Sequence, residues 1–442
     1  MRCVAVQGAS AARASMVVAS LWIGAEVMAA PAQPTFCEVT QIALGAVQGQ
    51  GVPAPISGFE VVLMHRGRVV YQRAFGAWTV GQVGNADSAT KTISGAVIMS
   101  QVDRSGGSFT LESRLSQYLP SFTGNKSGIT VRQAFSHSSG LPGNSLALSN
   151  TTISLQQAAV QIAGMPMQYN PGEGFLYGGV SMHAAGSAAE VAAGESWNAM
   201  FIQRIAEPLG MTRTRYVLSS ESNPRIAGGC DSNAEEFARF MDMLRAGGVY
   251  NGVRVLSQSA VSAMFTRQSP QGVPVLGTPI AGLSDYGVGV WLDQRDAQGQ
   301  LIGALAAGAR GFTSWIDFDD GIVGCVATDV SSSGNVRELV ALLRSAAERE
   351  VRNAPCSPAD VGDDTGDPLG PCASFRNNSG INEGDYNAFF NGFFIRASWS
   401  DIAFDNGDPL PPFGETPDAG VNNGVNEGDY NCFFNNFFLG CP

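Results

Sequence analysis

Lysine and histidine are scarce in this chain of 442 residues. It has 24 arginines but only two lysines, Lys91 and Lys126, and its three histidines are His65, His137 and His183. A Ser-His-Asp triad would need one of these histidines, and none lies in a recognisable triad context. The chain also lacks a G-x-S-x-G elbow, an H-E-x-x-H motif, a P-loop and a G-x-G-x-x-G that follows a strand. The sequence therefore gives no support to a triad hydrolase, a zinc protease or a nucleotide-binding enzyme.

Basic residues are almost absent from the last 87 residues of the chain. From Cys356 onward there are 13 acidic and two basic residues, whereas the preceding 355 residues carry 25 acidic and 24 basic ones. A nearly neutral body with an acidic tail has no basic surface for nucleic acid, so that class of partner is excluded. With 44% hydrophobic and 14% charged residues, the chain is also too apolar to be disordered.

The first 32 residues resemble a secretory signal peptide. Arg2 and Arg13 precede an apolar stretch that ends in small residues, and cleavage is expected after Ala30 or Ala32. Glu26 interrupts the apolar run, which makes it a poor membrane span, although a retained anchor is the alternative. No later stretch is long enough to cross a bilayer. We therefore expect the mature protein to be secreted, periplasmic or attached to the cell surface, with no membrane span.

The chain that follows the predicted signal peptide has an odd number of cysteines. Without Cys3 of the signal segment seven remain: Cys37, Cys230, Cys325, Cys356, Cys372, Cys432 and Cys441. At least one thiol is thus unpaired or pairs between chains. Four of the seven lie in the tail, where an oxidising compartment can use them as crosslinks, and their pairing is open. Cys325 lies in an apolar run and is predicted to be a buried residue of a strand.

The body, up to Val351, alternates between strand and helix patterns. Strands are predicted at both ends of the body, with helices between them. The predicted strands are 59–65, 68–76, 286–293, a stretch around 311–317, and 321–330; the clearest predicted helices are 88–102, 234–244 and 336–351. This order indicates an α+β domain whose two terminal regions pair in one antiparallel sheet.

The candidate chemistry lies in the segment Ser88-Ala-Thr-Lys91. A serine and a lysine three residues apart share one face of a helix, so the amine can reach the hydroxyl and act as its base. The start of a helix also favours a developing alkoxide. The amine must be neutral to accept a proton, which burial can achieve, and arginine could not replace it. A surface lysine on an ordinary helix is the alternative, but the apolar residues that follow Lys91 favour a buried one.

Five segments together resemble the serine β-lactamase and penicillin-binding protein superfamily, in particular its class C-like branch of esterases and D-amino-acid peptidases. They are NADSATKTISG (85–95), LESRLSQYLPSF (111–122), ITVRQAFSHSSGLPG (129–143), NPGEGFLYGGVSMHAAG (170–186) and IAEPLGMTRTRY (205–216). The resemblance covers about Gly58 to Val351. It implies a β-lactamase-like fold, in which an antiparallel sheet flanked by helices lies beside a helical subdomain and the active site lies in the cleft between them.

The resemblance also implies roles for individual residues. Ser88 resembles the nucleophile that is acylated, and Lys91 resembles its general base. Tyr177 matches the tyrosine of the family's Y-x-N motif, which relays protons. The backbone amides of Ser88 and Ala309 would form the oxyanion hole, which stabilises the tetrahedral intermediate. No cofactor is implied for this chemistry.

The sequence departs from the family at two candidate substrate-binding positions. Gly179 stands where the family usually has Asn, and Ala306 stands where Lys or His is common; Ala307 and Gly308 complete the third motif. The missing side chains would contact the amide and carboxylate of a β-lactam. We therefore expect a serine hydrolase that acts through an acyl-enzyme on an ester or small amide. The alternative is a catalytically inactive binding module.

The tail contains one unit twice. Residues 378–394, NSGINEGDYNAFFNGFF, recur as NNGVNEGDYNCFFNNFF at 422–438. In each copy we expect an aspartate to start a helix with a single aromatic face, and the two faces to bury each other. The tail resembles a degenerate dockerin. This resemblance implies a calcium site in the second copy and a protein or cell-surface partner; the predicted ligands are Asp418, Asn422, Asn426 and Asp429, and the first copy offers only Asn378, Asn382 and Asp385.

These observations predict four parts. Residues 1–32 form the signal peptide, and residues 38–352 form the β-lactamase-like hydrolase domain. Residues 353–363 are a linker, and residues 364–442 form the dockerin-like tail. We expect the hydrolase domain to fold without the tail, since a helix already closes its core.

Overall fold

The structure is a computed structural model. It describes residues 36–330, 333–355, 357–369, 378–404, 406, 408–410, 413, 422 and 424–439. The predicted signal peptide and Asp418 lie outside the described residues. No helix in the described part of the chain has both the length and the hydropathy that a membrane crossing requires.

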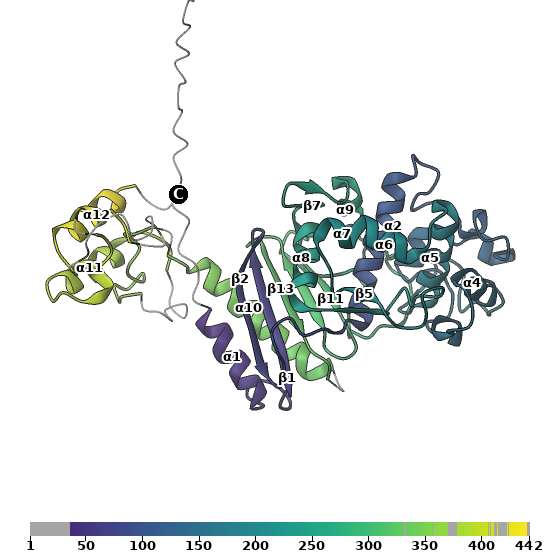
Figure 1. Cartoon of the computed structure of the whole chain (residues 1–442), viewed down its shortest axis with the longest axis horizontal. Coiled ribbons are helices and arrows are strands. Elements are labelled where there is room, and N and C mark those ends of the chain that lie inside the picture. The colour runs from purple at the N-terminus through teal and green to yellow at the C-terminus, as the bar shows by residue number, and fades with distance from the viewer. Residues whose placement is uncertain are drawn as a thin grey trace, which may run out of the picture.

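A six-stranded antiparallel sheet forms the centre of the body (Figure 1). Its strands, in spatial order, are β10 (Trp291–Arg295), β11 (Leu301–Ala307), β12 (Thr313–Asp317), β13 (Ile322–Ala327), β1 (Gly58–His65) and β2 (Arg68–Gly76). The first strand pairs with the last, with Val62 opposite Cys325. This confirms that the terminal regions of the body meet in one sheet. Every residue of β1 except His65 is buried, because helices cover both faces of the sheet.

Two helices from opposite ends of the body cover one face of this sheet. They are α1 (Cys37–Val47) and α10 (Ser333–Arg352), which pack on each other and on β1, β12 and β13. The carboxylate of Glu350 is buried and accepts hydrogen bonds from the amides of Glu38 and Val39, which lie in the first turn of α1 and have no acceptor within the helix. Sequence analysis identified α10 but not α1. Cys37, at the start of α1, is disulfide-bonded.

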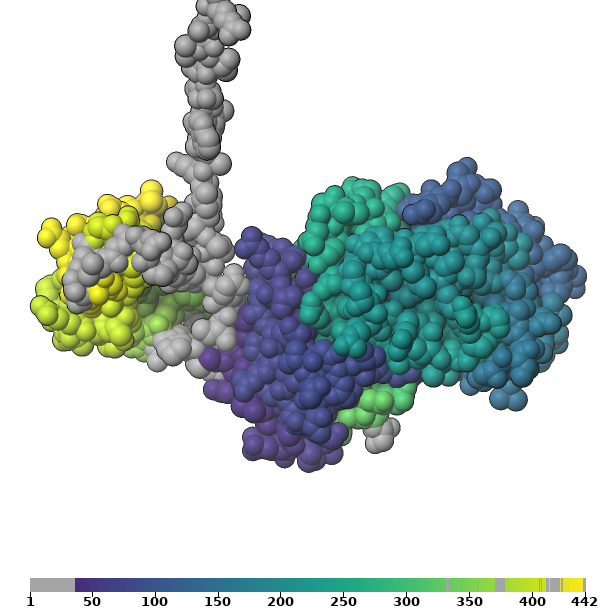
Figure 2. Space-filling model, in the orientation of Figure 1, coloured from purple at the N-terminus to yellow at the C-terminus, as the bar shows by residue number. Residues whose placement is uncertain are grey.

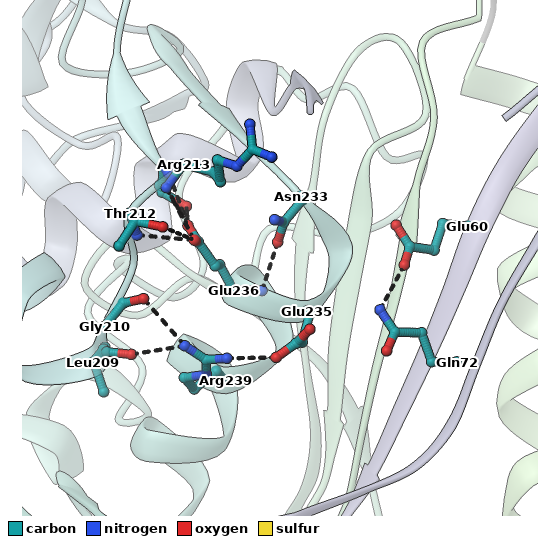
Figure 3. Close-up of polar contacts among 11 residues, drawn as sticks. Glu60, Gln72, Leu209, Gly210, Thr212, Arg213, Asn233, Glu235, Glu236 and Arg239 are labelled. Carbon is teal, nitrogen blue, oxygen red and sulfur yellow. Dashed lines mark hydrogen bonds and ion pairs between the residues drawn. The ribbon is translucent and has the colours of Figure 1, made fainter. Parts of the chain in front are cut away.

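Helix α8 (Ala234–Arg245) covers the other face of the sheet. Asn233 caps its start by accepting a hydrogen bond from the amide of Glu236. The carboxylate of Glu236 accepts hydrogen bonds from the amides of Thr212 and Arg213, and Arg239 donates to carbonyl groups of the same segment (Figure 3). These bonds join α8, which lies on the sheet, to the helical subdomain.

The helical subdomain packs around α2 (Thr90–Arg104), which is buried from Thr90 to Gln101. Its other helices are α3 (Val131–Phe135), α4 (Leu155–Ala163), α5 (Val180–Ala193), α6 (Trp197–Phe201), α7 (Glu207–Leu209) and α9 (Gln258–Met264). Short strands outside the six-stranded sheet pair with one another: β3 (Gly84–Asn85) and β5 (Arg215–Tyr216) with β6 (Cys230–Ser232), β4 (Phe175–Leu176) with β9 (Val275–Gly277), and β7 (Val249–Tyr250) with β8 (Val253–Arg254). The β-lactamase-like fold with its helical subdomain is thus confirmed.

The described part of the tail is built around two helices, α11 (Glu383–Phe393) and α12 (Glu427–Phe437), and its residues gather in a lobe of their own in Figure 2. Phe389 and Phe433 stack with their ring centroids 4.0 Å apart. Tyr386 at the start of α11 meets Phe437 at the end of α12, so the helices are antiparallel. Ala359 and Val361, from the predicted linker, belong to the same apolar cluster.

The starts and the aromatic faces of the tail helices differ from expectation. Asn382 and Asn426, not aspartates, cap the two helices, and Asp385 and Asp429 occupy the third helical position of each capping box. The aromatic faces bury each other only in part. Phe394 remains 77% exposed, and it lies just past the end of α11.

Candidate active site

Ser88 lies in a tight 3-10 turn, Asp87–Ala89, which leads directly into α2. Its predicted partner Lys91 follows one turn later, inside the helix. Asp87, the residue before the serine, has a positive φ of 45°, which is a strained backbone conformation for a residue other than glycine. The turn thus holds the serine at the edge of the helix, where its side chain faces a cavity.

The amine of Lys91 is almost fully buried and donates two hydrogen bonds. One goes to Ser88 Oγ at 2.9 Å and the other to the carbonyl oxygen of Ala227 at 2.8 Å. Burial, followed by the positive charge of Arg225, lowers the pKa of Lys91 to about 7, while Asp87 acts in the opposite direction. An amine with this pKa is partly neutral at neutral pH, so it can take the proton of the Ser88 hydroxyl.

Tyr177 completes the cluster from the loop between β4 and α5. Its hydroxyl lies close to Ser88, and its ring lies 4.6 Å from the Lys91 amine. Burial raises the pKa of Tyr177, so its hydroxyl keeps its proton at neutral pH. The ring packs on His137, whose centroid is 4.4 Å away, and on Trp291 at 5.1 Å. Burial also holds the pKa of His137 well below its ordinary value, so this imidazole is neutral.

Ser88, Tyr177 and Ala309 lie between two cavities. The larger, of about 290 Å³, is mostly apolar and has walls from β10, β11 and α10. Its lining includes Pro279, Ile280, Trp291, Leu305, Ala307, Gly308, Arg337, Val340 and Ala341. The smaller, of about 200 Å³, is more polar and is lined by Asp87, Lys91, Gly143, Asn144, Leu148, Gly178, Gly179, Arg225, Ala227 and Gly228. A substrate with its carbonyl group at Ser88 would place one substituent in each cavity.

The two positions that depart from the family pattern have different surroundings. Gly179 lines the smaller cavity, and a Cβ there would lie 2.9 Å from Leu148 Cδ2 and 3.1 Å from Ala227 Cβ. Leu148 thus occupies the space that a larger residue would need. Ala306 is buried in the core and lines neither cavity, whereas its neighbour Ala307 does. The reason is the alternation of β11, which directs Leu305 and Ala307 to the cavity and Ala306 to the opposite face.

Sequence analysis missed three charged residues at this site. Asp87 and Arg225 line the smaller cavity, and Arg310 forms a salt bridge with Asp87. Asp87 directly precedes the predicted nucleophile, so its position alone was a usable signal. Arg225 and Arg310 carry no local motif, and only the fold brings them next to Ser88.

The three predicted calcium ligands within the described residues, Asn422, Asn426 and Asp429, use their side chains in hydrogen bonds within the protein. The carboxylate of Asp429 accepts hydrogen bonds from the amides of Ile402, Ala403 and Asn426. The side-chain oxygen of Asn426 accepts from Gly428, and that of Asn422 accepts from Gly424. Within the described residues, no group of three or more His, Cys, Asp or Glu side chains is arranged to hold a metal ion.

A Ser-Lys-Tyr cluster in a cleft between an antiparallel sheet and a helical subdomain defines a β-lactamase-like protein. The chain belongs to the Beta-lactamase family, whose model matches residues 49–348. Among curated proteins no sequence matches the chain.

Solved structures share the fold of the body. A protein of Bacteroides dorei DSM 17855, described as a candidate β-lactamase, is 26% identical, with a TM-score of 0.61 over 69% of this chain and 98% of that one. A family VIII carboxylesterase is 18% identical, with a TM-score of 0.58 over 72% and 98% of the two chains. A penicillin-binding protein homologue from Caulobacter crescentus is 17% identical with the same TM-score and coverage. The last two show the similarity of the fold alone.

Proposed function

We propose that this protein is a serine hydrolase that acts through an acyl-enzyme on an ester or small amide, and that it needs no cofactor. The observation that carries the proposal is the 2.9 Å hydrogen bond between Lys91 and Ser88, made by a buried amine whose pKa is lowered to about 7. Proteins of similar fold, which include a family VIII carboxylesterase and a D-stereospecific amidohydrolase, support the same reaction class.

In the proposed reaction Ser88 Oγ attacks the substrate carbonyl carbon while its proton passes to Lys91 Nζ. The amides of Ser88 and Ala309 stabilise the negative charge that develops on the carbonyl oxygen. Among the described residues neither amide donates to a protein acceptor, so both are open to a substrate oxygen. The bond to the leaving group then breaks, and Tyr177 passes the proton from Lys91 to that group. Water attacks the acyl-enzyme by the same route and releases the acid.

The two cavities support an ester or a small amide with one apolar substituent. The larger, apolar cavity suits an acyl chain or the aromatic ring of an alcohol, because transfer of such an apolar group from water into the cavity favours binding. Beside the smaller cavity Leu148 and Ala227 lie close to Gly179, so an asparagine that could bind a β-lactam amide would have to displace Leu148. We therefore propose that β-lactam hydrolysis is much slower than ester hydrolysis.

Fluorophosphonate labelling tests the proposal against the alternative of an inactive binding module. A fluorophosphonate should label the full chain at Ser88, and Ser88→Ala should abolish both labelling and the turnover of short aryl esters. Ser88 is the only residue changed, so circular dichroism and the melting temperature should stay the same. Unchanged turnover in Ser88→Ala would reject the assignment, and absence of labelling in the natural chain would favour the binding module.

A second proposed function, attachment to a protein partner outside the cell, belongs to the tail. Six rings form a continuous aromatic face, two from each helix and one from the residue that follows each helix: Tyr386, Phe390, Phe394, Tyr430, Phe434 and Phe438. Phe394 is 77% and Phe438 78% exposed, and exposed apolar surface of this kind marks interaction sites. Because acidic residues dominate the tail, the expected partner surface is apolar with a basic rim.

Cell fractionation of the secreting organism tests this attachment. The double substitution Phe394→Ser and Phe438→Ser should move the protein from the cell surface to the medium and leave ester hydrolysis unchanged. Leu146→Ser is the control, since Leu146 is 88% exposed but lies in the body. Equal retention of all three proteins would reject the aromatic face as the attachment surface.

Calcium in the second repeat is proposed on the dockerin-like sequence alone. If calcium binds there, calorimetry of the full chain should show a higher melting temperature of the tail on calcium addition. Asp418→Ala should reduce that effect more than Asn378→Ala. The hydrogen bonds of Asp429 and Asn426 within the protein predict a helix pair that also forms without calcium. If calcium does not change the melting temperature of the tail, the helix pair is independent of the cation.

A further inference from the structure

Asp87 and Arg310 are joined by three hydrogen bonds beside the predicted oxyanion hole. Arg310 Nε donates to Asp87 Oδ2 at 3.0 Å, and Nη2 donates to Oδ1 at 3.2 Å. The backbone amide of Arg310 also donates to Oδ2, at 3.1 Å. This third bond fixes the main chain of Arg310 as well as its side chain. The carboxylate thus joins two segments that are 223 residues apart in the sequence.

Each partner of this ion pair is the direct neighbour of a residue with an unengaged amide. Asp87 precedes Ser88, and Arg310 follows Ala309; both neighbours line the two cavities, and neither of their amides has a backbone acceptor among the described residues. The two amides can bind one oxygen only if their spacing is fixed, and they come from different segments. No other side-chain bond in the described part of the chain joins Asp87 to the segment that follows β11.

The backbone at Asp87 also requires support. Its φ of 45° is a left-handed conformation that costs about 1 kcal/mol or more for a residue with a side chain. Asn85 Oδ1 accepts a hydrogen bond from the Asp87 amide at 2.9 Å, and Arg310 holds the carboxylate from the other side. This strained conformation sets the direction of the next amide, which is that of Ser88.

We propose that the Asp87–Arg310 ion pair positions the oxyanion hole by fixing the amide of Ser88 relative to that of Ala309. This inference rests on the proposed acyl-enzyme reaction. Asp87 and Arg310 are positioning residues, since they act through the backbone of their neighbours. The alternative is an ordinary salt bridge at a partly exposed site, which would contribute a little to stability and nothing to catalysis.

The kinetic test compares Asp87→Asn and Arg310→Gln with Asp329→Asn. Asp329 forms the outer contact of Arg310, at 3.4 Å, so its substitution perturbs the same arginine without breaking the inner pair. With an aryl ester, both inner variants should lower kcat about 10- to 100-fold and leave KM nearly unchanged, because the amides bind the oxyanion of the transition state more strongly than the ester carbonyl. Asp329→Asn should keep the kcat of the natural protein.

The pH profile gives a second readout that a loss of stability would not produce. Lys91 is surrounded by Asp87, Arg225, Tyr177 and His137, of which the last two are neutral at neutral pH. Asp87→Asn removes a negative charge and should move the acidic limb of kcat/KM to lower pH. Arg310→Gln leaves that negative charge without its partner and should move the limb to higher pH.

Each outcome decides the proposal. A kcat that stays within about twofold of the natural value in Arg310→Gln would overturn it, and so would a rise in KM at constant kcat. If Arg310→Gln does not fold, Arg310→Lys replaces it. The single ammonium can reach only part of the carboxylate, so the kcat of Arg310→Lys should lie between those of the natural protein and Asp87→Asn. A kcat equal to that of the natural protein would again overturn the proposal. Turnover that persists in Ser88→Ala would instead reject the proposed function itself.

Discussion

The buried amine of Lys91 donates a hydrogen bond of 2.9 Å to Ser88 Oγ. Two features of the surroundings keep this amine close to neutrality: it is removed from water, and the cation of Arg225 lies nearby. A lysine on the surface, with a pKa near 10.5, would be a poor base at neutral pH. The proposed chemistry therefore depends on the core around α2 as much as on the two residues themselves.

The pH dependence of ester hydrolysis should report the Lys91 amine. Its pKa is lowered to about 7, and only the neutral form accepts the serine proton. We therefore expect kcat/KM to be constant on the alkaline side of about pH 7 and to fall as the pH drops below it. Lys91→Arg should be inactive at every pH, since a guanidinium stays protonated. Constant kcat/KM from pH 5 to pH 9 would contradict a lysine base.

Removal of the Tyr177 hydroxyl should slow the reaction without unfolding the protein. Tyr177→Phe leaves the ring packed on His137 and Trp291 but deletes the hydroxyl that lies close to Ser88. Loss of a positioned proton relay should lower kcat by about 10²- to 10⁴-fold. Tyr169→Phe is the matched control, because the Tyr169 hydroxyl donates a hydrogen bond to the His137 carbonyl and Tyr169 lines neither cavity. Its free energy of unfolding should fall by about 1 kcal/mol, while kcat stays the same. Similar kcat values in the two variants would exclude the relay.

Gly179→Asn should not create a β-lactamase. The new Cβ would meet Leu148 at 2.9 Å, so we expect a loss of about 1–3 kcal/mol in unfolding free energy and no gain in cephalosporin hydrolysis. Leu148→Ala combined with Gly179→Asn should recover part of that stability, because the smaller side chain makes room for the asparagine. Denaturant unfolding and cephalosporin turnover measure the two effects. A Gly179→Asn protein as stable as the natural one would show that Leu148 moves aside freely.

A protein that ends at Ala354 should keep the catalytic unit. Helix α10 already covers the sheet, so we expect kcat/KM for an aryl ester to stay within about twofold of the full chain. The disulfide of Cys37 complicates this comparison, since Cys230, Cys325 and Cys432 are free and the other half of the bond lies outside the described residues. Cys37→Ser in the full chain is therefore the control for any change in melting temperature. Loss of activity in the shortened protein, but not in this control, would place the tail within the catalytic unit.

Local patterns were sufficient for much of the fold. The alternation of apolar residues predicted β1 and β2, and the periodicity of Phe237, Phe240 and Met241 predicted α8. The pattern of α1 is equally regular, since Val39, Ala43 and Ala46 are spaced by three and four residues, but it follows directly after the apolar signal-like segment, which obscures it. The exposed Phe394 was predicted to be buried, because helical periodicity does not tell where a partner helix ends.

The sequence by itself determined the pair Ser88 and Lys91, because residues three apart at the start of a helix meet whatever the rest of the chain does. The tertiary structure alone decided what surrounds that pair. Arg225, Arg310 and the Ala227 carbonyl come from segments far along the chain, and their distances to Lys91 and Asp87 depend on how the sheet packs against the helical subdomain. Since the pKa of an amine depends on burial and on nearby charges, packing set it, and no local motif encodes that packing.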